Sequence, residues 1–210
     1  MILKNKLKNT GNKKKLKNRK EKRSYGLTGA GSGLGTTHIS LALANYMHSV
    51  LKKKVVFIEY SSKSNLISMF QDKNVSLGPN DGYMYKGVEY LLHKREREIL
   101  DVINKVNAYI VIDCGCDFDS AKAILDHCDN KIVIGSMKPW RQREYIKYVN
   151  KNIVKNYDIS KIKYLIDGKE LAEIKLFYSF FKRRPVGVSN IQNPFRLREE
   201  DFDIINEIMA

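Results

Sequence analysis

The sequence has no run of about 20 uninterrupted apolar residues, the length that a membrane-spanning helix needs. It has only three cysteines, Cys114, Cys116 and Cys128, an odd number that cannot all pair in disulfides. The opening Met-Ile-Leu is followed by lysines and not by an apolar stretch, so we expect no secretory signal. These absences favour a protein of the reducing cytoplasm.

Acidic residues are nearly missing from the first part of the chain. Residues 1–24 contain eleven lysines and arginines against the single acid Glu21, so this stretch alone carries +10 of the net charge of +15. Such a dense block of like charge repels itself and lacks apolar anchors, which predicts a disordered basic tail over residues 1–23. It also lacks interleaved aromatic residues, so base stacking is not indicated.

Electrostatic attraction is the use that we favour for this tail. A nucleic-acid backbone would bind it without regard to base sequence and with a steep dependence on salt. An anionic membrane would attract it through the same charges. A merely solubilising arm is the third alternative.

The remaining residues, 24–210, have the composition of one globular domain. The whole chain is 43% hydrophobic and 29% charged, which excludes wholesale disorder and collagen-like repeats. Apolar runs alternate with helical periodicity, as in a parallel α/β sheet. We therefore predict an α/β fold with a doubly wound, mainly parallel sheet and helices on both faces. Strands are predicted at 24–28, 54–60, 108–114, 131–135, 161–167 and 185–189, helices at 37–51, 85–92, 95–106, 139–151, 170–181 and 199–209, and a long loop that contains one short helix at 61–82.

A glycine-rich segment, GAGSGLGTT, begins at Gly29 and lies between the first predicted strand and the first long helix. Several glycines allow backbone N–H groups to curl around an anion, and the start of the helix adds partial positive charge. A hydroxyl at the helix start can bind Mg²⁺. The alternative is a glycine-rich turn without a ligand, and the glycines alone do not decide between the two.

Four segments taken together are more specific. GLTGAGSGLGTTHISLALANYM, KKVVFIEYSSKSNL, AYIVIDCG and DNKIVIGSMKPWRQREY follow one another in an order and spacing that resembles the MinD/ParA family of P-loop NTPases. The resemblance extends over about residues 25–209 and is strongest up to Tyr145. It implies the P-loop NTPase fold and a nucleotide, ATP or another, bound with Mg²⁺.

The resemblance also implies a set of site residues. Thr37 would supply the Mg²⁺-binding hydroxyl, and Asp113 would hold the ion through water. The nucleotide-binding residues implied are Gly31, Ser32, Gly33, Leu34, Gly35, Thr36, Thr37 and His38, although a helix-cap or packing role suits His38 equally well.

The sequence departs from the family at the positions that matter most for hydrolysis. Thr36 stands in place of the phosphate-binding lysine, and neither Ala30 nor Gly31 is the second, signature lysine. Ser61 replaces the acid that helps to position the attacking water. Because positioned positive charge supplies most of the rate of phosphoryl transfer, the sequence predicts a degenerate Walker A loop, weak or absent hydrolysis and no assigned catalytic residue.

Three functions remain open on this basis. The leading hypothesis is a nucleotide-binding docking or positioning switch, conceivably in pilus or secretion assembly, that forms a homodimer or pairs with a competent paralogue and docks to an unknown protein partner. The second is an active partition-type ATPase stimulated by DNA or a partner, with the missing charge supplied by Lys138, Arg141 or the tail. The third is a nucleotide-free scaffold. All three predict a cytoplasmic protein, which the basic tail could make peripheral to the membrane or the nucleoid.

Two further features are predicted to be structural, and a third concerns the base preference. Trp140 could stack on a base, but packing beneath the following helix is the favoured interpretation. The apolar stripe of residues 170–181 could be a partner-binding or membrane-binding face, yet core packing is favoured. Asp167 stands where the MinD/ParA family, which the sequence resembles, often has an adenine-contacting Asn. The base preference is therefore open.

Overall fold

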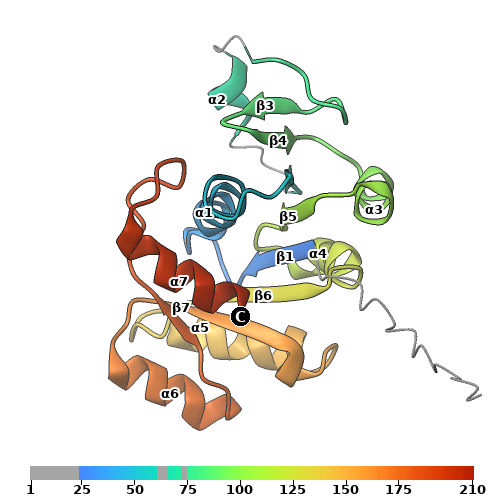
Figure 1. Cartoon of the computed structure of the whole chain (residues 1–210). Coiled ribbons are helices and arrows are strands. Elements are labelled where there is room, and N and C mark those ends of the chain that lie inside the picture. The colour runs from blue at the N-terminus through green and yellow to red at the C-terminus, as the bar shows by residue number, and fades with distance from the viewer. Residues whose placement is uncertain (1–23, 61–65, 72–74) are drawn as a thin grey trace, which may run out of the picture.

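The computed structural model describes residues 24–60, 66–71 and 75–210 of the chain. The predictions for the tail, residues 1–23, and for Ser61 lie outside these residues. The described residues form one eight-stranded sheet in the order β3-β4-β2-β5-β1-β6-β7-β8 (Figure 1). Every pairing is parallel except the one between β3 and β4. The strands are β1 (Ser24–Gly29), β2 (Val55–Glu59), β3 (Tyr83–Tyr85), β4 (Val88–Leu91), β5 (Tyr109–Asp113), β6 (Asn130–Gly135), β7 (Ile162–Asp167) and β8 (Val186–Val188).

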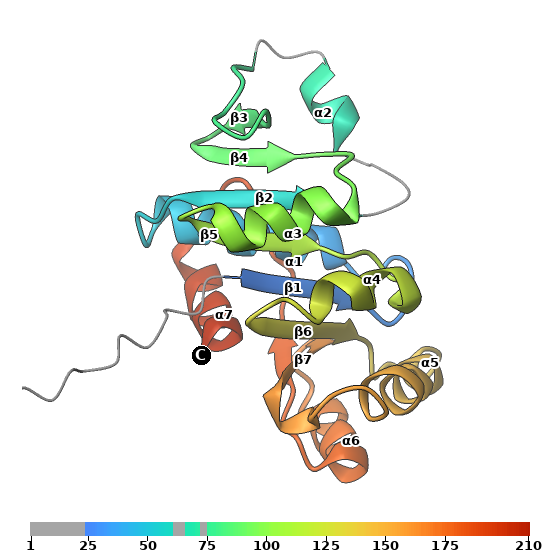
Figure 2. The same ribbon diagram turned by 90° about the vertical axis from the view of Figure 1, so that its right-hand side faces the viewer.

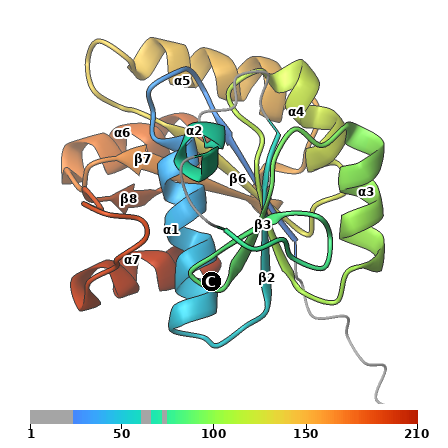
Figure 3. The ribbon, with the colours of Figure 1, turned by 90° about the horizontal axis from the view of Figure 1, so that it is seen from above.

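Helices cover both faces of this sheet, as predicted (Figures 2 and 3). One apolar core joins the sheet to α1 and α7, and a second core joins it to α3, α4, α5 and α6. The central strands are buried on both sides because β-branched and aromatic residues run through them without alternation. The helices are α1 (Thr36–Ser49), α2 (Ile67–Gln71), α3 (Glu96–Lys105), α4 (Phe118–Leu125), α5 (Gln142–Tyr148), α6 (Leu171–Phe181) and α7 (Glu199–Met209).

The strand order places the glycine-rich loop at the carboxyl edge of the sheet. β1 lies between β5 and β6. The helix that follows β1, α1, packs on one face of the sheet, whereas α4 and α5, which follow β5 and β6, pack on the other face. Crevices of this kind are where open α/β sheets bind ligands. Within the described residues, no helix is long and apolar enough to cross a membrane.

The predicted helix over residues 85–92 is wrong. This segment contains the end of β3, a tight turn and β4, which together form an antiparallel hairpin. The two turn residues, Lys86 and Gly87, adopt positive φ angles of 48° and 80°, the combination that a two-residue hairpin turn of the right twist requires. Glycine tolerates this conformation, and the tyrosines and Val88 on either side favour strands over helices.

Two further helices differ from prediction. The sequence reading places no helix at α4, although Phe118, Ala121, Ile124 and Leu125 recur at helical spacing and are buried. The helix predicted to begin at Pro139 begins instead at Gln142, and it continues past Tyr148 as a π-helical turn over Val149–Ile153. Residues 138–141 form a turn, closed by the Arg141 amide, which donates to the Lys138 carbonyl at 2.8 Å.

Candidate functional site

The glycine-rich loop is pinned between two strands before it reaches α1. The Gly29 amide donates to the Gly115 carbonyl after β5, and the Ala30 amide donates to the Ile134 carbonyl of β6, both at 2.8 Å. Gly33 and Gly35 then adopt positive φ angles of 72° and 80°. Because glycine has no Cβ, the chain can make this turn without steric strain and enter the helix directly.

The backbone donors of this loop are open. Gly35 caps α1 in a left-handed conformation without a side-chain cap bond, and the first helical bond runs from the Ile39 amide to the Gly35 carbonyl at 2.9 Å. Among the described residues, no backbone acceptor pairs with the amides of residues 31–35. A Cβ added at Gly33 or Gly35 would meet nothing within 4 Å. Unpaired N–H groups beside open space at the positive end of a 14-residue helix are what an anion needs.

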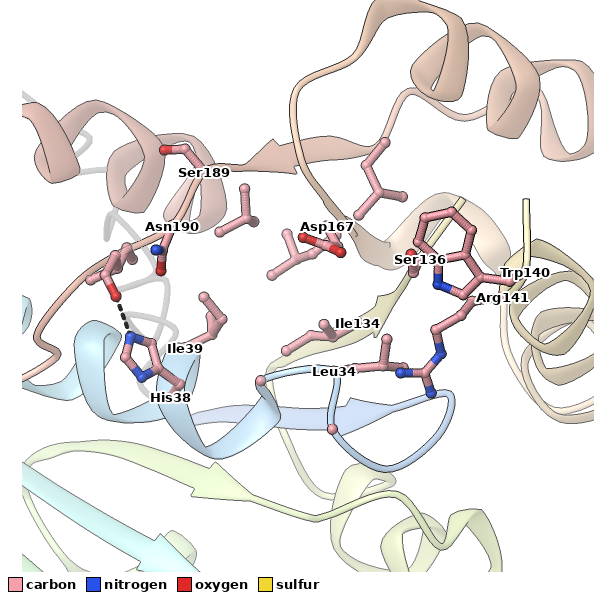
Figure 4. A pocket seen from close by; sticks show the side chains of 16 residues that line it. Leu34, His38, Ile39, Ile134, Ser136, Trp140, Arg141, Asp167, Ser189 and Asn190 are labelled. Atoms are coloured by element: carbon pink, nitrogen blue, oxygen red, sulfur yellow. Dashed lines mark hydrogen bonds between the residues drawn. The ribbon is translucent and has the colours of Figure 1, made fainter. Parts of the chain in front are cut away.

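A cavity of about 420 Å³ lies beside the loop (Figure 4). Its walls come from the loop, the first turn of α1, the carboxyl ends of β6, β7 and β8, and the turn that follows β6. Its volume falls within the range of roughly 300–1,000 Å³ typical of small-molecule sites. The polar and aromatic side chains that line it are His38, Ser136, Trp140, Arg141, Asp167, Ser189 and Asn190.

Half of the predicted nucleotide-binding residues line this cavity, and of the other half only Thr36 is buried in the protein interior. Gly33, Leu34, Gly35 and His38 line the cavity, whereas Gly31, Ser32, Thr36 and Thr37 do not. Thr36, at the position of the missing lysine, is buried, and its hydroxyl lies so close to Gly29 that a Cβ added at Gly29 would clash with Thr36 Oγ1. The side chain at the lysine position therefore points inward and supplies no charge.

Thr37 and Asp113 come together as predicted for a metal-binding pair. Thr37 Oγ1 donates to Asp113 Oδ2 at 2.5 Å, and the Gly115 amide donates to Asp113 Oδ1 at 3.1 Å. Burial raises the pKa of the Asp113 carboxyl, and the nearby charge of Glu59 raises it further, while the bonds from Thr37 and Gly115 lower it. A hydroxyl oxygen beside a buried carboxylate is a donor set that fits Mg²⁺, which prefers oxygen ligands.

Arg141 brings positive charge to the loop from another element. Its Nη2 donates to the Ser32 carbonyl at 3.0 Å and to the Glu144 carboxylate, also at 3.0 Å. Lys138, three residues earlier, pairs instead with Glu173 of α6 at 3.0 Å. Of the two basic residues, Arg141 is therefore the one in contact with the loop.

His38 closes one end of the cavity. Its Nε2 lies 2.5 Å from the Ile191 carbonyl, and because a carbonyl oxygen only accepts, Nε2 carries the proton in this contact. The bond ties the first turn of α1 to the segment between β8 and α7 (Figure 4).

The prediction that Trp140 packs beneath the following helix is wrong. Its side chain is 79% exposed and lines the cavity in the turn between β6 and α5. Helix α5 begins two residues after it, so no helix surface is available to cover the indole. Asp167, at the end of β7, lines the same cavity.

Three lining residues were missed by the sequence analysis. Ser136 follows β6, and Ser189 and Asn190 follow β8. All three lie directly after a strand, at the edge of the sheet where parallel strands present their carboxyl ends. A systematic search of the polar residues after each predicted strand could have identified them.

No protein-family model matches the sequence, and no curated protein matches it. Solved structures do match. A ParA family ATPase from Chlorobium tepidum aligns with a TM-score of 0.66 at 12% identity, over 90% of this chain and 99% of the other. A putative plasmid partition protein from Borrelia burgdorferi bound to AMPPNP aligns with a TM-score of 0.61 at 16% identity, over 89% and 97%.

The septum site-determining protein MinD from Pyrococcus horikoshii, complexed with Mg-ADP, aligns with a TM-score of 0.58 at 14% identity, over 80% of this chain and 81% of the other. The Borrelia protein is thus bound to AMPPNP and the Pyrococcus protein to Mg-ADP. The three alignments cover 80–90% of this chain. The chain has the α/β fold of the MinD/ParA P-loop ATPases.

Proposed function

We propose that this chain binds ATP with Mg²⁺ at the glycine-rich loop and acts as a docking or positioning switch with weak or absent hydrolysis. The observation that carries the proposal is the open amide loop beside the cavity, with the Thr37–Asp113 pair at its end. The amides of residues 31–35 would bind phosphate oxygens, and the cavity would take the nucleoside. Main-chain donors can do this without a lysine.

Magnesium would be held by Thr37 directly and by Asp113 through water, and when bound it would neutralise charge on the phosphates. Both side chains contribute oxygen and already contact each other at 2.5 Å, so little rearrangement is needed to present them to one ion. Asp113 is buried and fixed by the Gly115 amide, which keeps its carboxylate in place.

Weak turnover follows from where the charges lie. Thr36 points into the protein, and the guanidinium of Arg141 is engaged by Glu144 and by the Ser32 carbonyl. A carboxylate that neutralises the nearby cation weakens the field that would stabilise charge on a transferring phosphoryl group. Binding energy would then be available for docking to a second copy, a competent paralogue or another protein partner, as in pilus or secretion assembly.

Calorimetric titration of the full chain with Mg-AMPPNP and with Mg-ATP tests the proposal. We expect one saturable site and little release of phosphate from ATP. Gly35→Val places a branched side chain at a φ of 80° and in the space beside the loop, so it should abolish the site. Leu77→Ala, at an exposed position outside the cavity, is the matched control and should bind as the wild type does.

The switch itself is tested by sedimentation with and without Mg-AMPPNP. We expect self-association, or binding to the partner under study, to change with nucleotide. A saturable site whose occupancy changes neither would overturn the switch and leave a passive nucleotide-binding protein. Absence of binding at millimolar nucleotide, in a chain that circular dichroism shows to be folded, would instead favour the nucleotide-free scaffold.

One observation favours the second candidate, an active partition-type ATPase stimulated by DNA or a partner. Arg141 already contacts the loop at the Ser32 carbonyl, so a partner that drew Glu144 away would free a cation beside the phosphates. This candidate predicts phosphate release that DNA or a partner stimulates and that Arg141→Ala abolishes.

A further inference from the structure

Helix α6 leaves an unusual number of large apolar side chains at the surface. Leu171, Tyr178 and Phe180 are 59%, 51% and 53% exposed, and Leu176 is exposed as well. The described residues expose seven large hydrophobic side chains in all, and these four belong to one helix of 11 residues. Core packing, which the sequence analysis favours for the apolar stripe of residues 170–181, therefore accounts for only some of its side chains.

The inner side of α6 is firmly anchored. Phe177 and Phe181 are buried, and the Phe177 ring packs against Tyr145 of α5 and Tyr164 of β7 at centroid distances of 5.3 and 5.2 Å. The helix lies at the periphery of the molecule, beside the last strands of the sheet (Figures 1 and 2). The exposed side chains thus belong to a helix that is fixed in place, and their exposure does not come from a loosely attached segment.

The exposed side of α6 is also basic. Five exposed lysines and arginines lie on it or directly beside it, whereas its acids contribute little. Glu173 is turned inward and paired with Lys138, which leaves Glu170 at the start of the helix as the exposed acid of this segment. The basic residues are Lys169, Lys175, Lys182, Arg183 and Arg184.

We propose that the outer face of α6 binds an anionic lipid bilayer. Apolar side chains that enter the boundary between headgroups and acyl chains, flanked by lysines and arginines that reach anionic headgroups, are the pattern of helices that lie in a membrane interface. The positive charge of this face complements the negative surface potential of such a membrane.

The arrangement of the side chains around the helix favours a bilayer over a protein groove. Leu176 and Phe180 lie four residues apart on one flank, Leu171 and Tyr178 seven apart on the other, and Lys175 lies between the two flanks. A groove in a protein takes one apolar stripe and would have to bury this lysine. At a membrane interface the lysine stem lies along the apolar layer while its ammonium stays at the headgroups.

Flotation of the full chain with vesicles tests the proposal. We expect binding to phosphatidylcholine vesicles that contain phosphatidylglycerol, and weak binding to phosphatidylcholine alone. Leu176→Ser combined with Phe180→Ser should reduce the bound fraction at limiting lipid by roughly tenfold. Leu77→Ser combined with Val154→Ser, which removes two exposed apolar side chains elsewhere, is the matched control and should change nothing.

The basic stretch of residues 1–23 is present in every variant, so its own attraction to lipid is common to all of them. If the Leu176/Phe180 variant binds vesicles as the wild type does, electrostatic attraction by other residues explains the binding and the proposal fails. If that variant instead abolishes self-association in the absence of lipid, a second copy covers α6 and the proposal fails as well.

A spectroscopic readout keeps the test independent of any loss of stability. The chain has one tryptophan, Trp140, so Tyr178→Trp in a Trp140→Phe background reports on α6 alone. We expect its emission to shift to shorter wavelength when anionic vesicles are added, because the indole enters a less polar layer. An emission maximum that stays constant while the protein floats with the vesicles would show that another surface makes the contact.

Discussion

The hydroxyl of Thr37 donates a hydrogen bond of 2.5 Å to the carboxylate of Asp113, a residue 76 positions away at the end of the neighbouring strand β5. The carboxylate is buried, its pKa is raised chiefly by that burial, and the in-register neighbour on β2, Glu59, is buried as well. A carboxylate so far from water as that of Asp113 destabilises the fold unless something compensates for its charge. A cation bound with a nucleotide would be such a compensation.

Asp113→Asn should therefore weaken Mg-nucleotide binding while stabilising the nucleotide-free protein. Loss of the carboxylate should raise the dissociation constant for Mg-AMPPNP by about 10- to 100-fold and affect binding without Mg²⁺ much less. The same change removes a buried charge, so the melting temperature without ligand should rise. Calorimetry with and without Mg²⁺ and thermal denaturation measure the two effects.

The stability effect has a definite dependence on pH. The pKa of Asp113 is raised in the folded protein, so the folded state holds this proton more tightly than the unfolded state does. Its charge therefore destabilises the fold above the folded pKa, and the penalty is relieved as the pH falls through that value. The difference in melting temperature between Asp113→Asn and the wild type should therefore shrink toward acid pH. A difference that grew toward acid pH would show that the buried charge of Asp113 does not destabilise the wild type.

Trp140 is a fluorescent probe of the cavity because it lines the cavity and is the only tryptophan in the chain. If the nucleobase stacks on its exposed indole, addition of Mg-AMPPNP should quench or shift the intrinsic fluorescence. Trp140→Ala should weaken binding by about 1–3 kcal/mol, the usual contribution of one base stacked on an aromatic ring, and Trp140→Phe should retain most of the affinity. Unchanged fluorescence together with saturable binding in calorimetry would place the base elsewhere.

The pair formed by Arg141 and Glu144 should set the affinity for the triphosphate. Glu144→Gln removes the carboxylate that holds Nη2 at 3.0 Å and leaves the guanidinium free beside the loop. Because both side chains are partly exposed, we expect a gain in affinity of at most about 1 kcal/mol. Arg141→Ala should lower the affinity instead, and Arg143→Ala, two residues further along in α5, is the matched control. Equal affinity in all four proteins would exclude a role for this arginine.

The sequence was sufficient for the features that depend on local pattern and on chain order. Uninterrupted runs such as KVVFIEY and AYIVIDC become the buried strands β2 and β5, and the glycines between β1 and α1 become a loop with open amides. The loop, Thr37 and Asp113 meet because parallel strands bring their carboxyl ends to one edge. These are consequences of the strand order and require no knowledge of side-chain packing.

The features that the sequence analysis missed depend on tertiary contacts. Residues 85–92 were predicted as a helix, but β4 within this segment pairs with β3 in a hairpin at the edge of the sheet, where the Phe70 ring stacks on Tyr83 at a centroid distance of 5.1 Å. The exposure of Trp140 depends on where α5 begins, and that of α6 on how much of the helix the sheet can cover. A pattern of apolar residues identifies a face without showing what packs against it.

Tyr145 should contribute to stability through its hydroxyl as well as its ring. The ring lies against Gly135, and the hydroxyl lies 3.1 Å from two carbonyls, those of Val133 in β6 and Leu165 in β7. One O–H can donate to only one acceptor at a time, so the bond is shared between two neighbouring strands in a fully buried place.

Tyr145→Phe keeps the ring and removes this donor, which leaves buried carbonyl oxygens without it. We expect a loss of about 1–2 kcal/mol in the free energy of unfolding, measured by urea denaturation. Tyr178→Phe removes the same hydroxyl from an exposed position on α6 and should stay within about 0.5 kcal/mol of the wild type. If Tyr145→Phe lowers the free energy of unfolding no more than Tyr178→Phe does, the hydrogen bond of the Tyr145 hydroxyl to β6 and β7 contributes nothing to stability.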